Sequence, residues 1–95
     1  MTTTVVNIRK APYDVYIGRA GKGQDGYFGN PYPLEWADRS TILEMFKGYF
    51  YARLAEDAEY KARVLELRGK VLGCFCKPLL CHGDMIAEYL NTLDS

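Results

Sequence analysis

The sequence has no excess of charge of either sign and no long apolar run. Its 12 Lys and Arg residues balance its 12 Asp and Glu residues, so the formal net charge is zero. Proteins that coat DNA or RNA need an excess of basic residues, and we therefore expect no nucleic-acid polymer as a partner. The longest apolar run is only a few residues, so we expect no membrane-spanning segment. The first residues, Met-Thr-Thr-Thr, lack the basic and apolar regions of a signal peptide.

Cysteine and histidine are scarce, and they lie together. The chain has three cysteines, Cys74, Cys76 and Cys81, and its single histidine, His82, follows the last of them. An odd number of cysteines makes a poor disulfide framework. Without a visible signal peptide, this cysteine content indicates a reducing cytoplasm.

The residues that are present are typical of one small folded domain. The chain has 95 residues, of which 48% are hydrophobic and 25% charged, so residues 1–95 are expected to form a single domain around one core. Aromatic residues make up 14%. Because so small a core leaves many aromatic side chains exposed, a second copy of the chain is a candidate partner.

The apolar pattern predicts the order β-β-α-α-β-α. Strands are expected at residues 4–10, 14–18 and 70–76, with the first two joined as a hairpin through residues 11–13. Helices are expected from about residue 40 to 53, from about 57 to 67, and from 81 or 82 to 93. The fold class is therefore α/β (or α+β), a small layered fold with helices against one short sheet.

Local signals mark the ends of these helices. Asp38 or Ser40 is expected to cap the first helix, and Thr41 with Glu44 matches the spacing of a capping box. Gly69 is expected to end the second helix. The apolar stripe of the first helix has helical period, and one of its positions is a charged residue; the stripe consists of Ile42, Met45, Phe46, Tyr49, Phe50 and Arg53.

The segment Gly73-Cys-Phe-Cys-Lys-Pro-Leu-Leu-Cys-His-Gly-Asp84 has two chemical interpretations. One is a zinc site, since Cys74, Cys76, Cys81 and His82 supply three sulfur ligands and one nitrogen ligand. Their spacing is tighter than in most zinc sites, which tie two segments together. A purely structural alternative is that the cysteines pack as small hydrophobic residues, with His82 at the surface and Asp84 as an acidic residue in the first turn of the last helix.

The other chemical interpretation is an anion site at the start of the last helix, where backbone N–H groups lack partners. Gly83 would let a ligand approach the backbone, and His82 would donate to an oxyanion or act as a general acid or base. Asp84 would contact a ribose hydroxyl or cap the helix.

A second group of candidates lies between residues 17 and 33, which are rich in glycine and aromatic residues. Arg19 follows a strand within a glycine-rich loop that can wrap a phosphate. Asn30 offers donors and acceptors for a base edge or for hydroxyl groups, and Phe28 and Tyr32 can stack on a ring. The alternatives are a loop with solvated cations and an aromatic turn that packs on the core.

Four segments carry a resemblance: Val5-Val-Asn-Ile-Arg9, Asp14-Val-Tyr-Ile-Gly-Arg19, Phe28-Gly-Asn-Pro31 and Gly73 to Asp84. They resemble a family of short bacterial and phage proteins catalogued as a domain of unknown function. The hallmark of that family is Gly-Cys-Trp-Cys-Lys-Pro…Cys-His-Gly-Asp, and Phe75 stands here in place of the tryptophan. The resemblance covers essentially the whole chain and implies a bacterial host cytoplasm. It also places several candidates at motif positions: Arg19, Asn30, Cys81, His82 and Asp84.

We expect a binding protein for a small phosphorylated ligand, a nucleotide or its derivative. The expected ligand-binding residues are Arg19, Phe28, Asn30, Tyr32, Cys81, His82, Gly83 and Asp84. One alternative is an enzyme that hydrolyses or transfers a nucleoside or nucleotide group, with His82 or Asp84 as acid or base and Cys81 as nucleophile. A third is a zinc-stapled protein-interaction module. By analogy with other small phage proteins, sequestering a nucleotide signal of host defence is a fitting role.

Overall fold

The computed structural model describes residues 2–18, 26–32, 34–75 and 81–93. Its strands are β1 (Thr4–Asn7), β2 (Val15–Tyr16) and β3 (Val71–Cys74). Its helices are α1 (Arg39–Glu56), α2 (Ala58–Leu65) and α3 (His82–Leu93), and a short 3₁₀ helix, η1 (Leu34–Trp36), precedes α1. The element order β-β-α-α-β-α and the α/β class are therefore confirmed. Within the described ranges, no helix is long and apolar enough to cross a bilayer.

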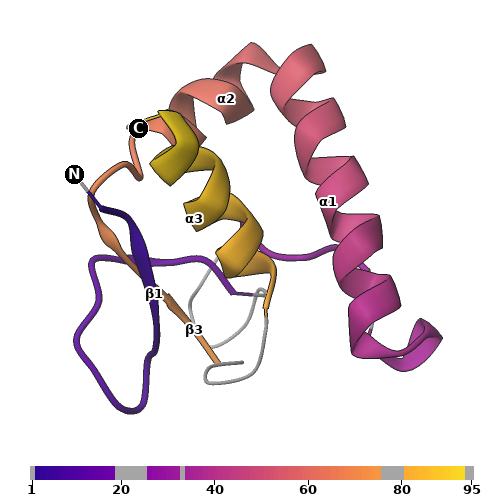
Figure 1. Cartoon of the computed structure of the whole chain (residues 1–95), viewed down its shortest axis with the longest axis horizontal. Helices are drawn as coiled ribbons and strands as arrows, with labels where there is room; N and C mark the ends of the chain where they lie inside the picture. Colours follow the sequence, from indigo (N-terminus) through magenta and orange to yellow (C-terminus); the bar gives the residue numbers. More distant parts are fainter. Residues whose placement is uncertain (1, 19–25, 33, 76–80, 94–95) are drawn as a thin grey trace.

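The three strands form one parallel sheet in the order β1-β3-β2. Figure 1 shows β1 and β3 side by side. The predicted hairpin between the first two strands is wrong, because β3 lies between them and pairs with both. A parallel neighbour cannot be reached through a tight turn, so the chain must travel back before β2 can begin. The reversal starts at Asn7, whose side-chain Oδ1 accepts a hydrogen bond from the backbone N–H of Arg9 at 2.9 Å. This turn ends β1 three residues before the predicted boundary at Lys10.

The return segment, residues 8–14, passes over one face of β3 at Gly73. A Cβ atom on Gly73 would lie 2.6 Å from Ile8 Cγ2 and 2.7 Å from Tyr13 Cγ. Glycine is therefore required here by the close approach of the return segment. Asp14 closes the segment, since its backbone N–H donates to the carbonyl of Val71 and its carboxylate accepts from the N–H of Val71.

Two aspartates set the boundaries of α1 and α2. The side chain of Asp38 accepts from the N–H of Thr41 at 2.9 Å, so Asp38 is the N-cap of α1. The predicted capping box of Thr41 and Glu44 is wrong, because Thr41 is already inside the helix. Asp57 ends α1 and caps α2 by accepting from the N–H of Tyr60. α2 ends at Leu65 with Glu66 as its C-cap, so the predicted stop at Gly69 lies too late in the chain; Gly69, with a φ of 75°, lies instead in the turn before β3.

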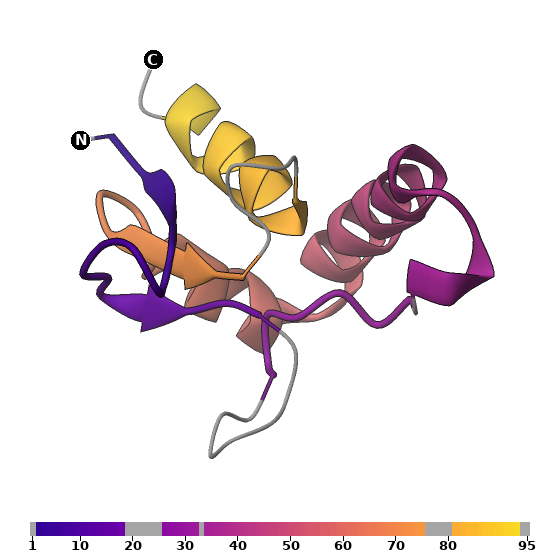
Figure 2. The same ribbon diagram turned by 90° about the horizontal axis from the view of Figure 1, so that it is seen from below.

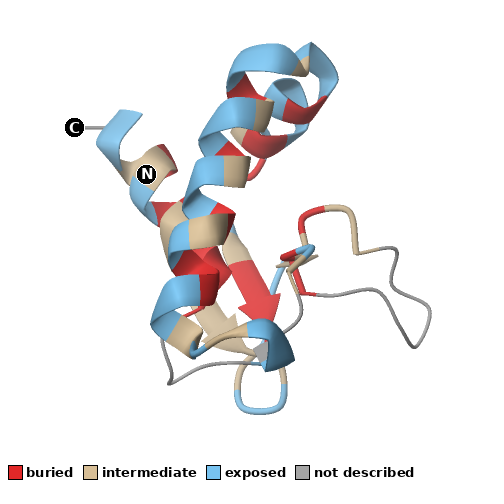
Figure 3. Cartoon of the chain, turned by 90° about the vertical axis from the view of Figure 1, so that its right-hand side faces the viewer, coloured by how far each residue is buried: buried red, intermediate tan, exposed pale blue. Residues whose placement is uncertain are grey.

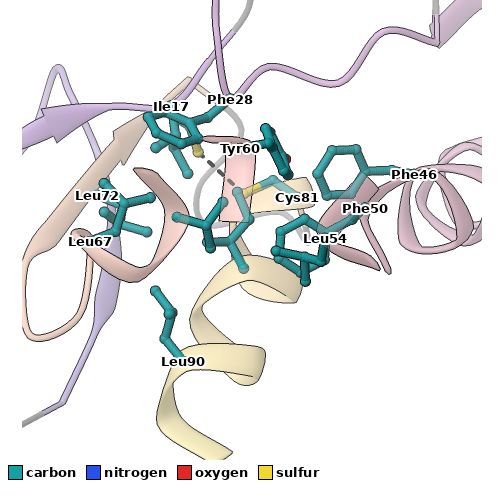
Figure 4. Packing of buried hydrophobic residues seen from close by; sticks show 13 residues of the cluster. Ile17, Phe28, Phe46, Phe50, Leu54, Tyr60, Leu67, Leu72, Cys81 and Leu90 are labelled. Carbon is teal, nitrogen blue, oxygen red and sulfur yellow. Dashed lines mark hydrogen bonds between the residues drawn. The ribbon is translucent and has the colours of Figure 1, made fainter. Parts of the chain in front are cut away.

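The helices bury their apolar faces against the other face of β3. Leu72 and Cys74 point into this core, on the side opposite the one that a Gly73 side chain would occupy. Figures 1 and 2 show α3 beside the strands and α1 farther out, and α3 contacts both β1 and α1. Figure 3 shows the buried residues gathered along β3 and on one side of the helices. The core cluster, which Figure 4 draws as sticks, comprises Ile17, Phe28, Phe46, Phe50, Leu54, Tyr60, Val64, Leu67, Leu72, Cys74, Cys81, Ile86 and Leu90.

The two ends of the described chain are fastened to each other. The backbone N–H of Thr3 donates to Asn91 Oδ1 at 2.8 Å, and Asn91 Nδ2 donates back to the carbonyl of Thr3 at 3.0 Å. The hydroxyl of Thr3 also accepts from the N–H of Gly69. These bonds hold the start of β1, the end of α3 and the turn before β3 together.

We predict that Gly83→Ala destabilises the fold by about 1–3 kcal/mol, because overpacking costs this much in a filled core. A Cβ atom at Gly83 would lie 2.5 Å from Ile17 Cδ1 and 3.1 Å from Val5 Cγ1. The matched control is Gly48→Ala on the exposed side of α1, where a Cβ atom would meet nothing within 4 Å. This control should gain up to about 1 kcal/mol from helix propensity. Urea unfolding measures both; a Gly83→Ala protein as stable as the parent would contradict the close helix–sheet contact.

Candidate functional site

The first turn of α3 is held by its own side chains. The backbone N–H of Cys81 donates to Asp84 Oδ2 at 3.0 Å, and the N–H of Asp84 donates to the carbonyl of Cys81, also at 3.0 Å. This reciprocal pair caps the helix: the carboxylate of Asp84 accepts the hydrogen bond of the backbone N–H that precedes the first helical residue. Gly83 is buried against Ile17 and Val5. Because it has no side chain, the helix can pack closely against these two residues.

The side chain of His82 lies inside the protein. It is 6% exposed, and its Nε2 lies 2.6 Å from the carbonyl oxygen of Ile17. Because a carbonyl oxygen only accepts, Nε2 carries the proton and donates it. The ring also meets Phe46 edge-on, with a centroid separation of 5.2 Å. His82 thus fastens the start of α3 to the end of β2 and to α1.

The described cysteines are buried next to each other. Cys74 and Cys81 are each 1% exposed, and their Sγ atoms lie 3.2 Å apart. The candidates Cys76 and Arg19 lie outside the described residues. Within the described ranges, no group of three or more His, Cys, Asp or Glu side chains is arranged to hold a metal ion.

The segment 26–32 is a compact turn against α1 and α2. Gly26 has a φ of 68°, and its carbonyl accepts from the N–H of Gly29. Asn30 is 6% exposed, and its Oδ1 accepts from the N–H of Tyr32 at 2.9 Å, which is an Asx turn. Phe28 is 8% exposed and belongs to the core. The ring of Tyr32 packs edge-on against Trp36 and Tyr49.

A pocket of about 370 Å³ lies between this segment and α1. Of the expected ligand-binding residues that the structure describes, only Asn30 lines it, whereas Phe28 supports it from the core and Tyr32 packs beside Tyr49 in its wall. The residues at the start of α3, Cys81 to Asp84, do not line it. The lining residues are Gly26, Tyr27, Gly29, Asn30, Pro31, Tyr49 and Arg53.

Among the described residues that line this pocket, Arg53 is the one with a positive charge. Its Nη1 donates to the hydroxyl of Tyr49 at 2.6 Å, and its Nε donates to Asp57 Oδ2 at 3.4 Å. The guanidinium carbon lies 4.1 Å from the ring centroid of Tyr60 and 5.3 Å from that of Tyr27. Arg53 thereby links the end of α1, the cap of α2 and the segment 26–32, and its side chain remains 30% exposed.

The electrostatics of the pocket keep Arg53 positively charged. Burial acts to lower the pKa of Arg53, but the hydrogen bond and charge interaction with Tyr49, together with Asp57, outweigh it and raise that pKa. Burial raises the pKa of Tyr60, so its phenol stays neutral. The backbone N–H of Tyr60 lowers the pKa of Asp57. Arg53 therefore remains positively charged at neutral pH.

Sequence reasoning missed Arg53, Tyr27 and Tyr49. Arg53 is the one charged residue in the apolar stripe of the first helix, and that anomaly is the signal that could have identified it. Tyr49 lies one turn earlier on the same apolar stripe, a position that predicts packing against the core. Nothing in the local pattern of Tyr27 separates it from its neighbour Phe28, which is in the core.

Comparisons with known proteins identify a family whose description states no activity or ligand. A family model described as Domain of unknown function (DUF4326) matches residues 3–92. The chain is similar to the "Uncharacterized 12.4 kDa protein in nrdA-td intergenic region" of Enterobacteria phage T4. The two are 39% identical over 89 residues, which cover 94% of this chain and 78% of the phage protein. No solved structure matches the chain.

We predict opposite outcomes for removing the hydroxyl groups of two tyrosines that touch Arg53. Tyr49→Phe should cost about 1 kcal/mol, because it removes the acceptor of a partly buried, charge-assisted hydrogen bond. Tyr60→Phe should leave stability unchanged or raise it, because the hydroxyl of Tyr60 is buried without a hydrogen-bond partner in the described structure. Thermal and urea unfolding measure both. Equal losses in the two variants would contradict these contacts.

Proposed function

The chain belongs to the family described as Domain of unknown function (DUF4326), and on that premise we propose that it binds a small phosphorylated ligand of the nucleotide class in the Arg53 pocket. The observation that carries the proposal is the guanidinium of Arg53 at the wall of a pocket otherwise built from aromatic, glycine and amide groups. A pocket of about 370 Å³ falls in the range of small-molecule sites.

Arg53 is suited to a phosphate group. A guanidinium presents five N–H donors in a planar fork, and phosphate oxygens accept two of them in parallel. Tyr49, Tyr60 and Asp57 hold the guanidinium in one place, so little side-chain entropy is lost when an anion binds.

The remaining walls are suited to a ring and a sugar. Tyr27 and Tyr49 offer aromatic faces and edges beside the cation, and bases stack on such side chains in nucleotide sites. Asn30 contributes a buried amide whose orientation is fixed by the Asx turn to Tyr32. Gly26 and Gly29 let a ligand come close to the backbone, because they carry no side chain.

We further propose that binding itself is the activity. The described residues that sequence reasoning offered as catalysts have structural partners: Asp84 caps α3, His82 donates to the carbonyl of Ile17, and Cys81 is buried beside Cys74. The role that we propose for such a site is to sequester a nucleotide signal in the cytoplasm of the bacterial host.

The test compares two arginines that both stack on Tyr27. The guanidinium carbon of Arg63 lies 4.0 Å from the centroid of that ring, but Arg63 does not line the pocket. We predict that Arg53→Gln weakens binding of nucleoside phosphates at least about tenfold, because a charge-assisted hydrogen bond is worth more than 1.4 kcal/mol. Arg63→Gln should bind like the parent.

The measurement is calorimetric titration of purified protein with linear and cyclic nucleoside phosphates, with nucleosides and inorganic phosphate as ligand controls. Circular dichroism checks that each variant is folded. Binding that survives in Arg53→Gln and is lost in Asp84→Asn would place the ligand at the start of α3 instead. Binding of no nucleotide by the parent would refute the proposed class.

A further inference from the structure

Two thiols from separate elements meet in the core. Cys74 is the last residue of β3, and Cys81 directly precedes α3. Both are present as thiols, each is 1% exposed, and their sulfur atoms lie 3.2 Å apart. Figure 4 shows the contact between them as a dashed line in the middle of the buried cluster.

We propose that Cys74 and Cys81 form a dithiol site that a small hydroperoxide converts into an intramolecular disulfide. This site is separate from the Arg53 pocket, since neither cysteine lines that pocket. It does not depend on the proposed nucleotide binding.

The geometry favours closure. A disulfide bond is about 2.05 Å long, so the two sulfur atoms need to approach by only about 1.2 Å. Each cysteine lies at the end of its element, where a small shift leaves most hydrogen bonds intact. The pairing of Cys74 with Asn7 is the last of the β1–β3 register, and Cys81 comes before the first residue of α3.

The chemistry balances with one hydroperoxide per disulfide. One sulfur, as thiolate, attacks the peroxide oxygen, which breaks the O–O bond and leaves a sulfenic acid and one water or alcohol. The second sulfur then attacks the sulfenic sulfur, the S–O bond breaks, and a further water leaves with the remaining thiol proton. Two thiols are oxidised, one peroxide is reduced, and the chain loses two hydrogen atoms.

Burial decides which oxidant reacts and where the reaction stops. At 1% exposure, the thiols are closed to bulky disulfides such as oxidised glutathione, whereas hydrogen peroxide is little larger than water. The partner sulfur at 3.2 Å traps the sulfenic acid before a second peroxide can oxidise it further. The disulfide would tie the end of β3 to the start of α3 and so raise the thermal stability of the chain.

The test treats the reduced, full-length protein with dilute hydrogen peroxide and measures its mass and its melting temperature. We expect a mass lower by two hydrogen atoms and a higher melting temperature, both reversed by dithiothreitol. Chymotryptic cleavage after Leu79 or Leu80, without reduction, separates Cys74 from Cys81 in sequence, so a linked peptide pair identifies the bond. Cys76→Ser should keep the linkage, and Cys74→Ser should abolish it.

Three results would overturn the proposal. One is a bond that includes Cys76, which the peptide masses of Cys76→Ser would show. Another is an increase in mass by two oxygen atoms, which indicates a sulfinic acid instead of a disulfide. The third is about one zinc per chain in protein purified without added metal, retained in Arg53→Gln and lost in Cys74→Ser. Because the linkage is mapped in the parent protein, the proposal remains testable even if a cysteine variant fails to fold.

Discussion

The contacts of Arg53 hold together the parts of the molecule on which the proposed function depends. From the last turn of α1, its guanidinium reaches Tyr49, the capping carboxylate of α2 at Asp57, and the rings of Tyr60 and Tyr27. Arg53 keeps 30% of its side chain exposed and forms part of a pocket wall. The same contacts that fasten the segment 26–32 to the helices also hold the guanidinium at the pocket wall, which is what the proposed binding of a phosphate requires.

The start of α3 contains cysteine, histidine and aspartate, residues typical of active sites, yet their side chains make contacts that hold the helix against the sheet and cap it. His82 donates to the carbonyl of Ile17, Asp84 caps the backbone of Cys81, and Gly83 gives way to Ile17 and Val5. Each of these residues connects the helix to the sheet or begins the helix. The proposed disulfide between Cys74 and Cys81 would join the same two elements covalently, since the two sulfur atoms are already in contact.

The helices and strands could be predicted from the sequence, whereas their pairing and packing could not. Periodicity located the three described helices, and the predicted start of the second helix near Asp57 is its N-cap. The parallel partner of β1 lies more than sixty residues away in the chain (Thr4 pairs with Val71), and no local pattern encodes such a pairing. The Arg53 pocket could not be derived from the sequence for the same reason: Arg53 and Tyr27 are adjacent only because α1 and the segment 26–32 pack together. Asn30 was named for the donors and acceptors of its amide, whereas its Asx turn to Tyr32 became apparent only in the structure.

The most direct test of the central claim is the NMR signal of the Arg53 side-chain Nε–Hε group in the parent protein. Packed over Tyr60 and bonded to Asp57, this proton should be shifted by ring currents and protected from exchange. Adding the tightest-binding nucleoside phosphate should move the Arg53 signal and leave that of Arg63 in place. An Arg53 signal that matches a solvated arginine, or that stays unmoved when the ligand binds, would contradict the account.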